Sequence, residues 1–260
     1  MTPTPDGLRA AGFAGLRIVG DVHGDARGLA AAVAGAEAAG LFLVQLGDLT
    51  DRGPDSPAVL RMMFALIDAG RGIFLLGNHD HKLRRALVGE AVRVERAGLG
   101  LTLDQIALAR DGAALTERAI AEIGRAPAWL RFGRLLCAHA AFHPAMLLEP
   151  PPPDAGARRP EGVVGRAIFG QVTGRTAPDG FPVRLTGWID RIPAGMIVAV
   201  GHDDRSRDGR PAVLRGAQGG TAIFLDTGAG KGGALAWRDF AWSEITLDAP
   251  QDQNSWMTAT

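Results

Sequence analysis

Short apolar runs that end in polar loops alternate with helical segments over the first part of the chain. Three of these runs predict buried strands: LRIVGDVHG (16–24), LFLVQLGDLTDRG (41–53) and GIFLLGNHD (72–80). Helices are predicted over 26–39 and from Ser56 to about residue 69. Near-continuous apolar strands that alternate with helices are typical of an α/β fold with a parallel sheet covered on both faces. Because the carboxyl ends of parallel strands meet at one edge, we expect the three polar loops to converge there.

The rest of the chain predicts further helices and strands on either side of a proline-rich loop. Residues 81–130 are expected to be mostly helical, and the segment EPPPPDAGARRPEG (149–162) predicts a surface loop. Antiparallel pairing is allowed for the last three of the later strands, which are predicted at 134–142, 196–203, 221–228 and 234–240.

No linker divides the chain convincingly, so we expect a single domain over residues 1–260. Residues 1–14 and 247–260 are expected to be loose termini. Residues 90–130 are expected to form a helical insertion, which is a candidate lid over a site.

Composition excludes some partners for the molecule as a whole. Lys and Arg number 28, Asp and Glu also number 28, and the formal net charge is zero, so global charge gives no reason to expect binding to nucleic acid or membranes. The one cysteine, Cys137, cannot form an intramolecular disulfide. The N-terminus lacks a signal-peptide pattern, and no run of about 18 apolar residues predicts a membrane span. We therefore expect a cytoplasmic protein.

Side chains able to bind metal ions follow the predicted strands directly. Four of the six histidines stand immediately after an apolar run or in its first loop turn. Glycines precede several of these residues and are expected to let the backbone turn sharply. A carboxylate can bridge two cations, while imidazole and amide oxygen complete each coordination shell and suit Mn²⁺, Fe or Zn²⁺ better than Ca²⁺. The candidate ligands are Asp21, His23, Asp48, Asn78, His139 and His202. Other polar residues at the same strand ends are Asp51, Arg52, His79, Asp80 and Asp226.

The motifs GDVHG, GDLTDRG and GNHD, with the later His139 and His202, resemble the calcineurin-like metallophosphoesterases of the phosphoprotein-phosphatase branch. The resemblance implies a four-layer αββα sandwich with a dinuclear site at the carboxyl ends of strands. Two divalent cations are implied, with Mn favoured and Fe, Zn, Ni or Co as alternatives. The implied ligands are Asp21 and His23 for the first metal, Asp48 as the bridge, and Asn78, His139 and His202 for the second.

The same resemblance implies how the reaction would proceed. A hydroxide that bridges the metals would attack phosphorus in line. His79 would protonate the leaving oxygen and would be oriented by Asp51. Arg52 would hold phosphate oxygens, and Asn78 would also face the substrate.

A second set of segments is similar to the phosphatase module of bacterial polynucleotide kinase-phosphatase and to PrpE-type and symmetrical dinucleoside tetraphosphatases. This resemblance implies that Asp226 is a further metal ligand or lies next to one. It also makes Arg166 and Arg175 candidates for binding a substrate phosphate. The segments are HDHKLRRALVG (79–89), LTLDQI (101–106), RAIFGQVTGRTAPDGFPVRLTGW (166–188) and LDTGAGKGG (225–233).

These observations predict a metal-dependent phosphoesterase that acts on nucleotides or nucleic-acid ends. Three alternatives stay open: a symmetrical dinucleoside tetraphosphate hydrolase, a protein Ser/Thr phosphatase, and an inactive metal-binding scaffold. The family's protein phosphatases usually have Glu where Asp80 follows His79, which disfavours the second alternative. The sequence leaves the oligomeric state open.

Overall fold

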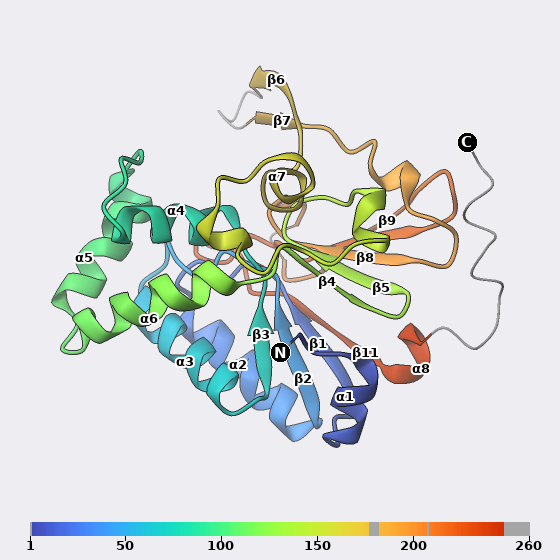
Figure 1. Ribbon diagram of the computed structural model, residues 1–260, viewed down its shortest axis with the longest axis horizontal. Helices are drawn as coiled ribbons and strands as arrows, with labels where there is room; N and C mark the ends of the chain where they lie inside the picture. The colour runs from blue at the N-terminus through green and yellow to red at the C-terminus, as the bar shows by residue number, and fades with distance from the viewer. Residues whose placement is uncertain (1, 177–181, 207, 247–260) are drawn as a thin grey trace.

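The computed structural model describes residues 2–176, 182–206 and 208–246, and shows strands in the centre with helices around them (Figure 1). The strands are β1 (Gly15–Val19), β2 (Leu41–Gln45), β3 (Gly72–Phe74), β4 (Trp129–Phe132), β5 (Leu135–Ala138), β6 (Val172–Thr176), β7 (Pro182–Arg184), β8 (Ile197–Val200), β9 (Ala212–Arg215), β10 (Thr221–Phe224) and β11 (Trp237–Ala241). The helices are α1 (Pro5–Ala10), α2 (Ala26–Ala38), α3 (Ser56–Asp68), α4 (Asn78–Leu87), α5 (Leu101–Leu108), α6 (Gly112–Arg125), α7 (Gly162–Phe169) and α8 (Trp242–Ile245).

The strands form two mixed sheets rather than one parallel sheet. The first has the order β11-β1-β2-β3, with β1, β2 and β3 parallel and β11 antiparallel to β1. The second has the order β4-β5-β8-β10-β9, with a parallel centre and antiparallel outer strands. Antiparallel pairing is therefore confirmed for β11, and for β10 along its edge with β9, but β8 and β10 pair parallel with each other. Strands β6 and β7 form a separate antiparallel ladder.

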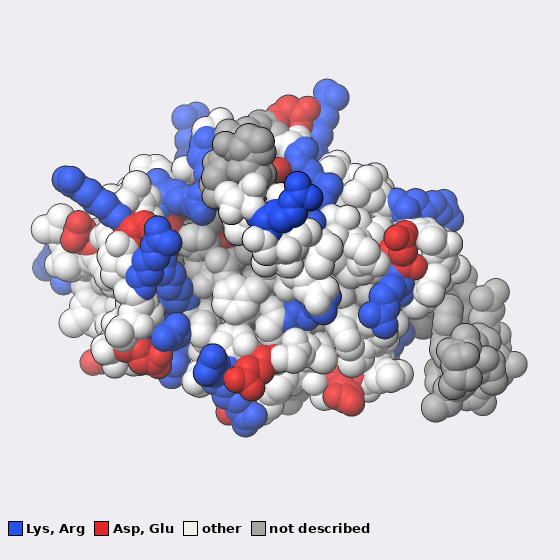
Figure 2. Space-filling view, turned by 90° about the horizontal axis from the view of Figure 1, so that it is seen from above, with Lys and Arg blue, Asp and Glu red and all other residues white. Residues whose placement is uncertain are grey.

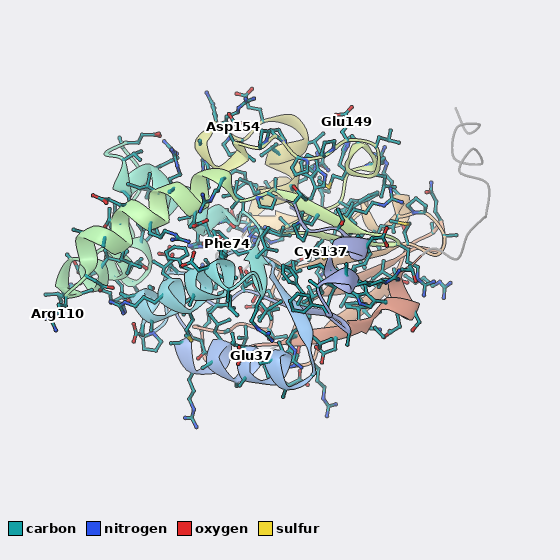
Figure 3. The ribbon with its side chains drawn as sticks, turned by 60° about the horizontal axis from the view of Figure 1, so that its bottom comes forward. Glu37, Phe74, Arg110, Cys137, Glu149 and Asp154 are labelled. Carbon is teal, nitrogen blue, oxygen red and sulfur yellow. The ribbon has the colours of Figure 1, made fainter. Side chains whose placement is uncertain are left out.

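Alternate residues of the central strands belong to two different cores, which explains their continuous apolar pattern. Leu16 and Ile18 of β1 lie in one cluster with Cys137 of β5 and Ile223 of β10, so this cluster fills the space between the sheets. Phe74 of β3 lies in the other cluster, which joins the strands to the helices. Figure 3 shows Phe74 and Cys137 inside the molecule. Cys137 is fully buried, as its strand position predicts.

Helices α2 and α3 pack on the first sheet, where the sequence predicts them. Asp25 caps α2 through the Gly28 amide. Asp55, rather than Ser56, caps α3 by accepting the Ala58 amide, so this helix begins at Ser56, one residue earlier than a cap at Ser56 would imply. On the second sheet, α7 and a short turn bring Ile168 and other side chains into the same core as β8 and β10.

The N-terminal segment differs from the expectation of a loose lead-in. Residues 5–10 form α1, which is capped by Thr4 and buries Leu8 against the inter-sheet cluster. The other predicted loose terminus, 247–260, lies outside the described residues. Within the described ranges, no helix combines the length and apolar composition needed to cross a bilayer.

Residues 81–130 are largely helical, as predicted, but the segment ends in β4, which the sequence analysis missed. Helix α6 packs against α3, α4 and α5, and it buries Leu115, Ala119 and Ile123. Residues 149–162 form mostly irregular structure with one short turn at Ala155–Ala157. We propose that the chain is a single domain, because one core lies between its two sheets.

Candidate metal centre

The carboxyl ends of strands from both sheets meet, and each of them supplies polar side chains to one buried cluster. Asp21 and His23 follow β1, Asp48 follows β2, and Asn78 begins α4 just after β3. The second sheet contributes the residues that follow β5, β8 and β10, which are His139, His202 and Asp226. Parallel strands that run in register deliver their loops to the same edge, so the sheets bring these residues together from across the chain.

Several residues of the cluster adopt left-handed backbone conformations themselves. The φ angles are +46° at His23, +61° at Asp48 and +62° at His202, a region that costs a non-glycine residue about 1–2 kcal/mol. Of the preceding glycines, Gly47 has a φ of +97° and so permits the expected turn, whereas Gly20 and Gly201 are required for close packing. A Cβ at Gly201 would lie 2.0 Å from Asp21 Oδ1, and one at Gly20 would lie 2.0 Å from the Leu225 carbonyl oxygen. The expected turn is thus confirmed at Gly47, while at Gly20 and Gly201 a steric reason replaces it.

His23 presents a neutral nitrogen to two carboxylates. Its Nδ1 lies 2.9 Å from the Thr50 carbonyl oxygen and donates to it, so Nε2 carries a lone pair. Nε2 lies 3.7 Å from Asp48 Oδ2 and 3.9 Å from Asp21 Oδ2. Burial lowers the pKa of His23 to about 3, so the imidazole is neutral at physiological pH. A neutral imidazole held by a backbone carbonyl is a typical metal ligand.

A second group of donor atoms surrounds His139. Its Nδ1 donates to the Leu46 carbonyl oxygen over 2.8 Å, so Nε2 is the ring nitrogen that faces the cluster. That nitrogen lies 3.0 Å from Asn78 Oδ1, 3.1 Å from His202 Nδ1 and 3.4 Å from Asp48 Oδ1. Burial opposes a charge on His139, but Asp48 and Asp21 raise its pKa to about 10. The surroundings therefore favour a positive charge at this point, and a divalent cation would supply it.

Asp48 lies between the two groups. Its Oδ1 faces His139, and its Oδ2 faces His23 and His79, each within 3.9 Å, so both groups include the same carboxylate. Although burial opposes its ionisation, His139 and His79 lower the pKa of Asp48 well below its ordinary value. An ionised carboxylate with its oxygens turned to two separate ligand groups has the arrangement that a bridging ligand requires.

Asp80 fixes the backbone around Asp48. Its Oδ2 accepts the amides of Asp48 at 2.7 Å and Gly77 at 3.0 Å, and its Oδ1 accepts the amide of Leu49 at 3.0 Å. Burial and the nearby Asp48 raise the pKa of Asp80 to about 6. The sequence analysis gave Asp80 no role of its own. Its position in the first turn of α4 was the available signal, since an acidic residue there accepts free backbone amides.

Negative charge accumulates on the Asp21 side of the cluster without enough hydrogen bonds to satisfy it. Both Asp21 oxygens lie 3.1 Å from the His202 amide. Burial and the neighbouring Asp226 raise the pKa of Asp21 well above its ordinary value. Asp226 Oδ1 accepts the Gly228 amide, but its buried Oδ2 has no hydrogen-bond partner among the described residues, and the cation that pairs with it is Lys231, whose Nζ lies 3.6 Å from Oδ2. An orphaned buried carboxylate oxygen beside a second carboxylate fits a bound cation.

His79 and Asp51 form a direct pair at the edge of the cluster. His79 Nδ1 lies 2.5 Å from Asp51 Oδ2, and because an ionised carboxylate only accepts, the proton between them belongs to His79. Burial opposes protonation of His79, but Asp48 and Asp51 raise its pKa overall. Arg52 adjoins them with φ +68° and forms no ion pair among the residues that the structure describes. Its guanidinium group is therefore available to an anionic ligand.

The two arginines predicted to bind substrate are not joined to this cluster. Within the described ranges, neither Arg166 nor Arg175 forms a hydrogen bond or ion pair with the residues above. Arg175 lies on the exposed strand β6, and Arg166 lies near Arg191 and His143. Arg184 of β7 does reach the cluster, because its guanidinium group contacts His202 Nε2. Sequence analysis missed Arg184, since the short β6–β7 ladder is largely exposed and has no periodic apolar signal.

The face seen from above in Figure 2 is hollowed near its centre, with Lys and Arg side chains around the hollow. A narrow pocket opens beside His202 and is lined in part by Gln171, Arg184 and Trp188. Trp188 is largely buried and packs on Phe224 at a ring-centroid distance of 5.8 Å. Cationic side chains at the mouth of a polar site favour the approach of an anionic ligand.

Comparison with known families supports the chemistry of this cluster. Residues 16–146 match the model of the calcineurin-like phosphoesterase family. An asymmetrical bis(5'-nucleosyl)-tetraphosphatase PrpE of Geobacillus sp. (strain WCH70) is 30% identical, over 79% of this chain and 77% of that protein. A protein of the same name from Geobacillus thermodenitrificans (strain NG80-2) is 32% identical, over 73% of this chain and 71% of its own length.

Solved structures share the fold at lower sequence identity. A structure provisionally assigned as a diadenosine tetraphosphatase superposes with a TM-score of 0.53 at 24% identity, covering 88% of this chain and 90% of that one. A protein serine/threonine phosphatase from Saccharomyces cerevisiae gives the same TM-score at 12% identity, covering 92% and 82%. These likenesses show that the predicted α/β sandwich is correct.

Proposed function

The chain belongs to the calcineurin-like phosphoesterase family and is therefore a hydrolase of phosphate esters, and from this premise we propose that it cleaves the phosphate chain of dinucleoside polyphosphates with two bound divalent cations. The observation that carries the proposal is the position of Asp48, which turns one oxygen to each of two ligand groups. The Asp226 oxygen that lacks a hydrogen bond among the described residues, and the Nε2 atoms of His23 and His139, each left facing the cluster because Nδ1 binds a backbone carbonyl, fit cations in both groups.

The ligand set divides according to these contacts. We assign Asp21, His23 and Asp226 to the first cation, Asn78, His139 and His202 to the second, and Asp48 to both. Nitrogen ligands mixed with hard oxygens suit Mn²⁺, with Fe, Zn, Ni or Co as alternatives. When bound, the cations supply Lewis acidity that withdraws charge from phosphate oxygens and lowers the pKa of an attacking water.

The chain's own groups supply the remaining chemistry. A bond forms between phosphorus and the water oxygen, the water loses one proton to solvent, the bond from phosphorus to the leaving oxygen breaks, and His79 Nε2 gives its proton to that oxygen. Asp51 holds the imidazole by its Nδ1, so that Nε2 faces the reacting phosphate. Arg52 and Arg184 lie where their guanidinium groups would bind the oxygens of the substrate's phosphates.

The choice of substrate is supported by the names of the relatives. They are described as asymmetrical tetraphosphatases, whereas the sequence analysis kept the symmetrical reaction as its alternative. Cleavage of diadenosine tetraphosphate by the asymmetrical route gives AMP and ATP, and the symmetrical route gives two ADP. We propose the asymmetrical products.

A substrate panel tests this proposal. Protein supplied with Mn²⁺ is expected to convert diadenosine tetraphosphate to AMP and ATP, and its kcat/KM should exceed those for a phosphopeptide, a 3'-phosphorylated oligonucleotide and a cyclic nucleotide by about tenfold or more, which is about 1.4 kcal/mol of transition-state binding. Products are separated by anion-exchange chromatography. An aliquot treated with EDTA is the control and should be inactive. Higher kcat/KM on the phosphopeptide or the oligonucleotide, or release of two ADP, would contradict the proposed substrate or route.

A further inference from the structure

A buried threonine of α5 contacts the loop that presents Asp51 and Arg52. The Thr102 side chain has no exposed surface, although it carries a hydroxyl group. Its Oγ1 lies 2.9 Å from the Asp51 amide nitrogen, 2.9 Å from Asp51 Oδ1 and 3.1 Å from Ser56 Oγ. Three polar contacts at one buried hydroxyl, made across 51 and 46 residues of chain, indicate a specific connection rather than an incidental one.

The direction of each hydrogen bond follows from the groups involved. The ionised Asp51 carboxylate can only accept, so the single hydroxyl proton of Thr102 is donated to Asp51 Oδ1. The Thr102 oxygen then accepts the Asp51 N–H and the Ser56 hydroxyl. Both the backbone and the side chain of Asp51 are therefore fixed by one residue, while the other carboxylate oxygen stays free for His79.

The Asp51 loop needs such support because its backbone is unfavourable. Asp51 and Arg52 have consecutive positive φ angles of +75° and +68°, and a charged or bulky side chain rarely adopts that region without external contacts. Gln105, one turn further along α5, binds the other end of the loop. Its Oε1 accepts the Ser56 amide over 2.9 Å, and its Nε2 donates to the Pro54 carbonyl over 2.8 Å.

We propose that Thr102 is a positioning residue that holds Asp51 in the orientation needed by His79, with Gln105 as a second contact from the same helix. This inference rests on the proposed role of His79 as the proton donor. Residues 90–130 were expected to form a lid, whereas in this inference α5 has the role of holding the Asp51–Arg52 loop in position through hydrogen bonds. Both of these loop-contacting residues belong to the motif LTLDQI, in which Thr102 and Gln105 stand three residues apart.

The test compares two phosphate esters that differ in their need for a proton donor. Thr102→Val keeps the side-chain shape and removes the hydroxyl group. With Mn²⁺ present, kcat for an alkyl phosphate should fall by about tenfold more than kcat for p-nitrophenyl phosphate, whose leaving group departs without a proton. Thr102→Ser keeps the hydroxyl group and should recover most of the loss. Thr116→Val, the same substitution on neighbouring α6, is the control and should change neither rate.

A double-mutant cycle with His79→Ala separates positioning from general damage. If Thr102 acts through His79, adding Thr102→Val to His79→Ala should cause little further loss on the alkyl phosphate. Equal losses on both esters for Thr102→Val, or full additivity with His79→Ala, would overturn the inference. If Thr102→Val does not fold, Gln105→Leu is tested in its place. The same results on the two esters, and in the cycle with His79→Ala, then support or overturn the inference. If His79→Ala by itself lowers kcat equally for the alkyl phosphate and for p-nitrophenyl phosphate, the proposed role of His79 as proton donor is wrong instead.

Discussion

Replacing Asp48 with Asn is expected to lower the metal-dependent kcat/KM by about 10³-fold or more. The two side chains have the same shape, and Asn tolerates the left-handed φ of +61° nearly as well as Asp, so the fold should persist. The amide oxygen can still accept the His79 backbone N–H that Asp48 Oδ1 accepts at 2.9 Å. What disappears is the negative charge shared by the two ligand groups, and stabilisation of transition-state charge by bound cations amounts to several kcal/mol.

The measurement is steady-state kinetics with Mn²⁺ from micromolar to millimolar concentration, together with metal content after dialysis. Asp25→Asn is the matched control, because Asp25 caps α2 from the loop after β1 and Asn caps a helix equally well. It should keep both activity and metal content. An Asp48→Asn protein that binds two metal equivalents and turns over near the wild-type rate would show that this carboxylate is not the bridge.

Replacing His79 with Ala is expected to slow substrates selectively according to their leaving groups. Proton donation by a positioned side chain contributes about 10²–10⁴-fold, so kcat for an alkyl phosphate should fall by about 10²-fold or more. The loss for p-nitrophenyl phosphate should be about tenfold or less, since nitrophenolate leaves unprotonated. The closeness of Asp51, at 2.5 Å from Nδ1, is the reason to assign this role to His79 and not to a ligand histidine.

His81→Ala provides the control for the loss of an imidazole from the same helix. His81 Nε2 contacts the Arg158 carbonyl at 3.0 Å, and burial lowers the pKa of His81, so its contact points away from the cluster. The variant should keep the ratio of rates for the two esters even if its melting temperature falls. Equal losses on both esters in His79→Ala would exclude His79 as the proton donor.

Much of this centre can be predicted from sequence because the fold places its residues at strand ends. Asp21, Asp48 and Asn78 each follow an apolar run, and strand direction alone puts such loops at one edge. Asp226 also belongs to this class, since it follows β10 directly. The prediction succeeds where a continuous apolar run indicates a buried strand and the polar residues after it mark the carboxyl end of that strand.

The parts that were missed depend on contacts between distant segments or on exposed strands. Thr102 and Asp51 are 51 residues apart, and no local pattern indicates that they meet. Arg184 lies on β7, whose residues are mostly exposed and so have no apolar alternation. The resemblance implied two sheets, but the parallel pairing of β8 with β10 was missed, because strands buried on both faces carry no sign of partner or direction.

The position of the cations themselves tests the account most directly. Crystals grown with Mn²⁺ and measured at its absorption edge should show two anomalous peaks about 3.5–4 Å apart, the usual separation in two-metal sites, with one Asp48 oxygen nearest to each. His23 Nε2 should face one peak and His139 Nε2 the other. A single peak, or two peaks with Asp48 near only one of them, would contradict a shared carboxylate and with it the proposed mechanism.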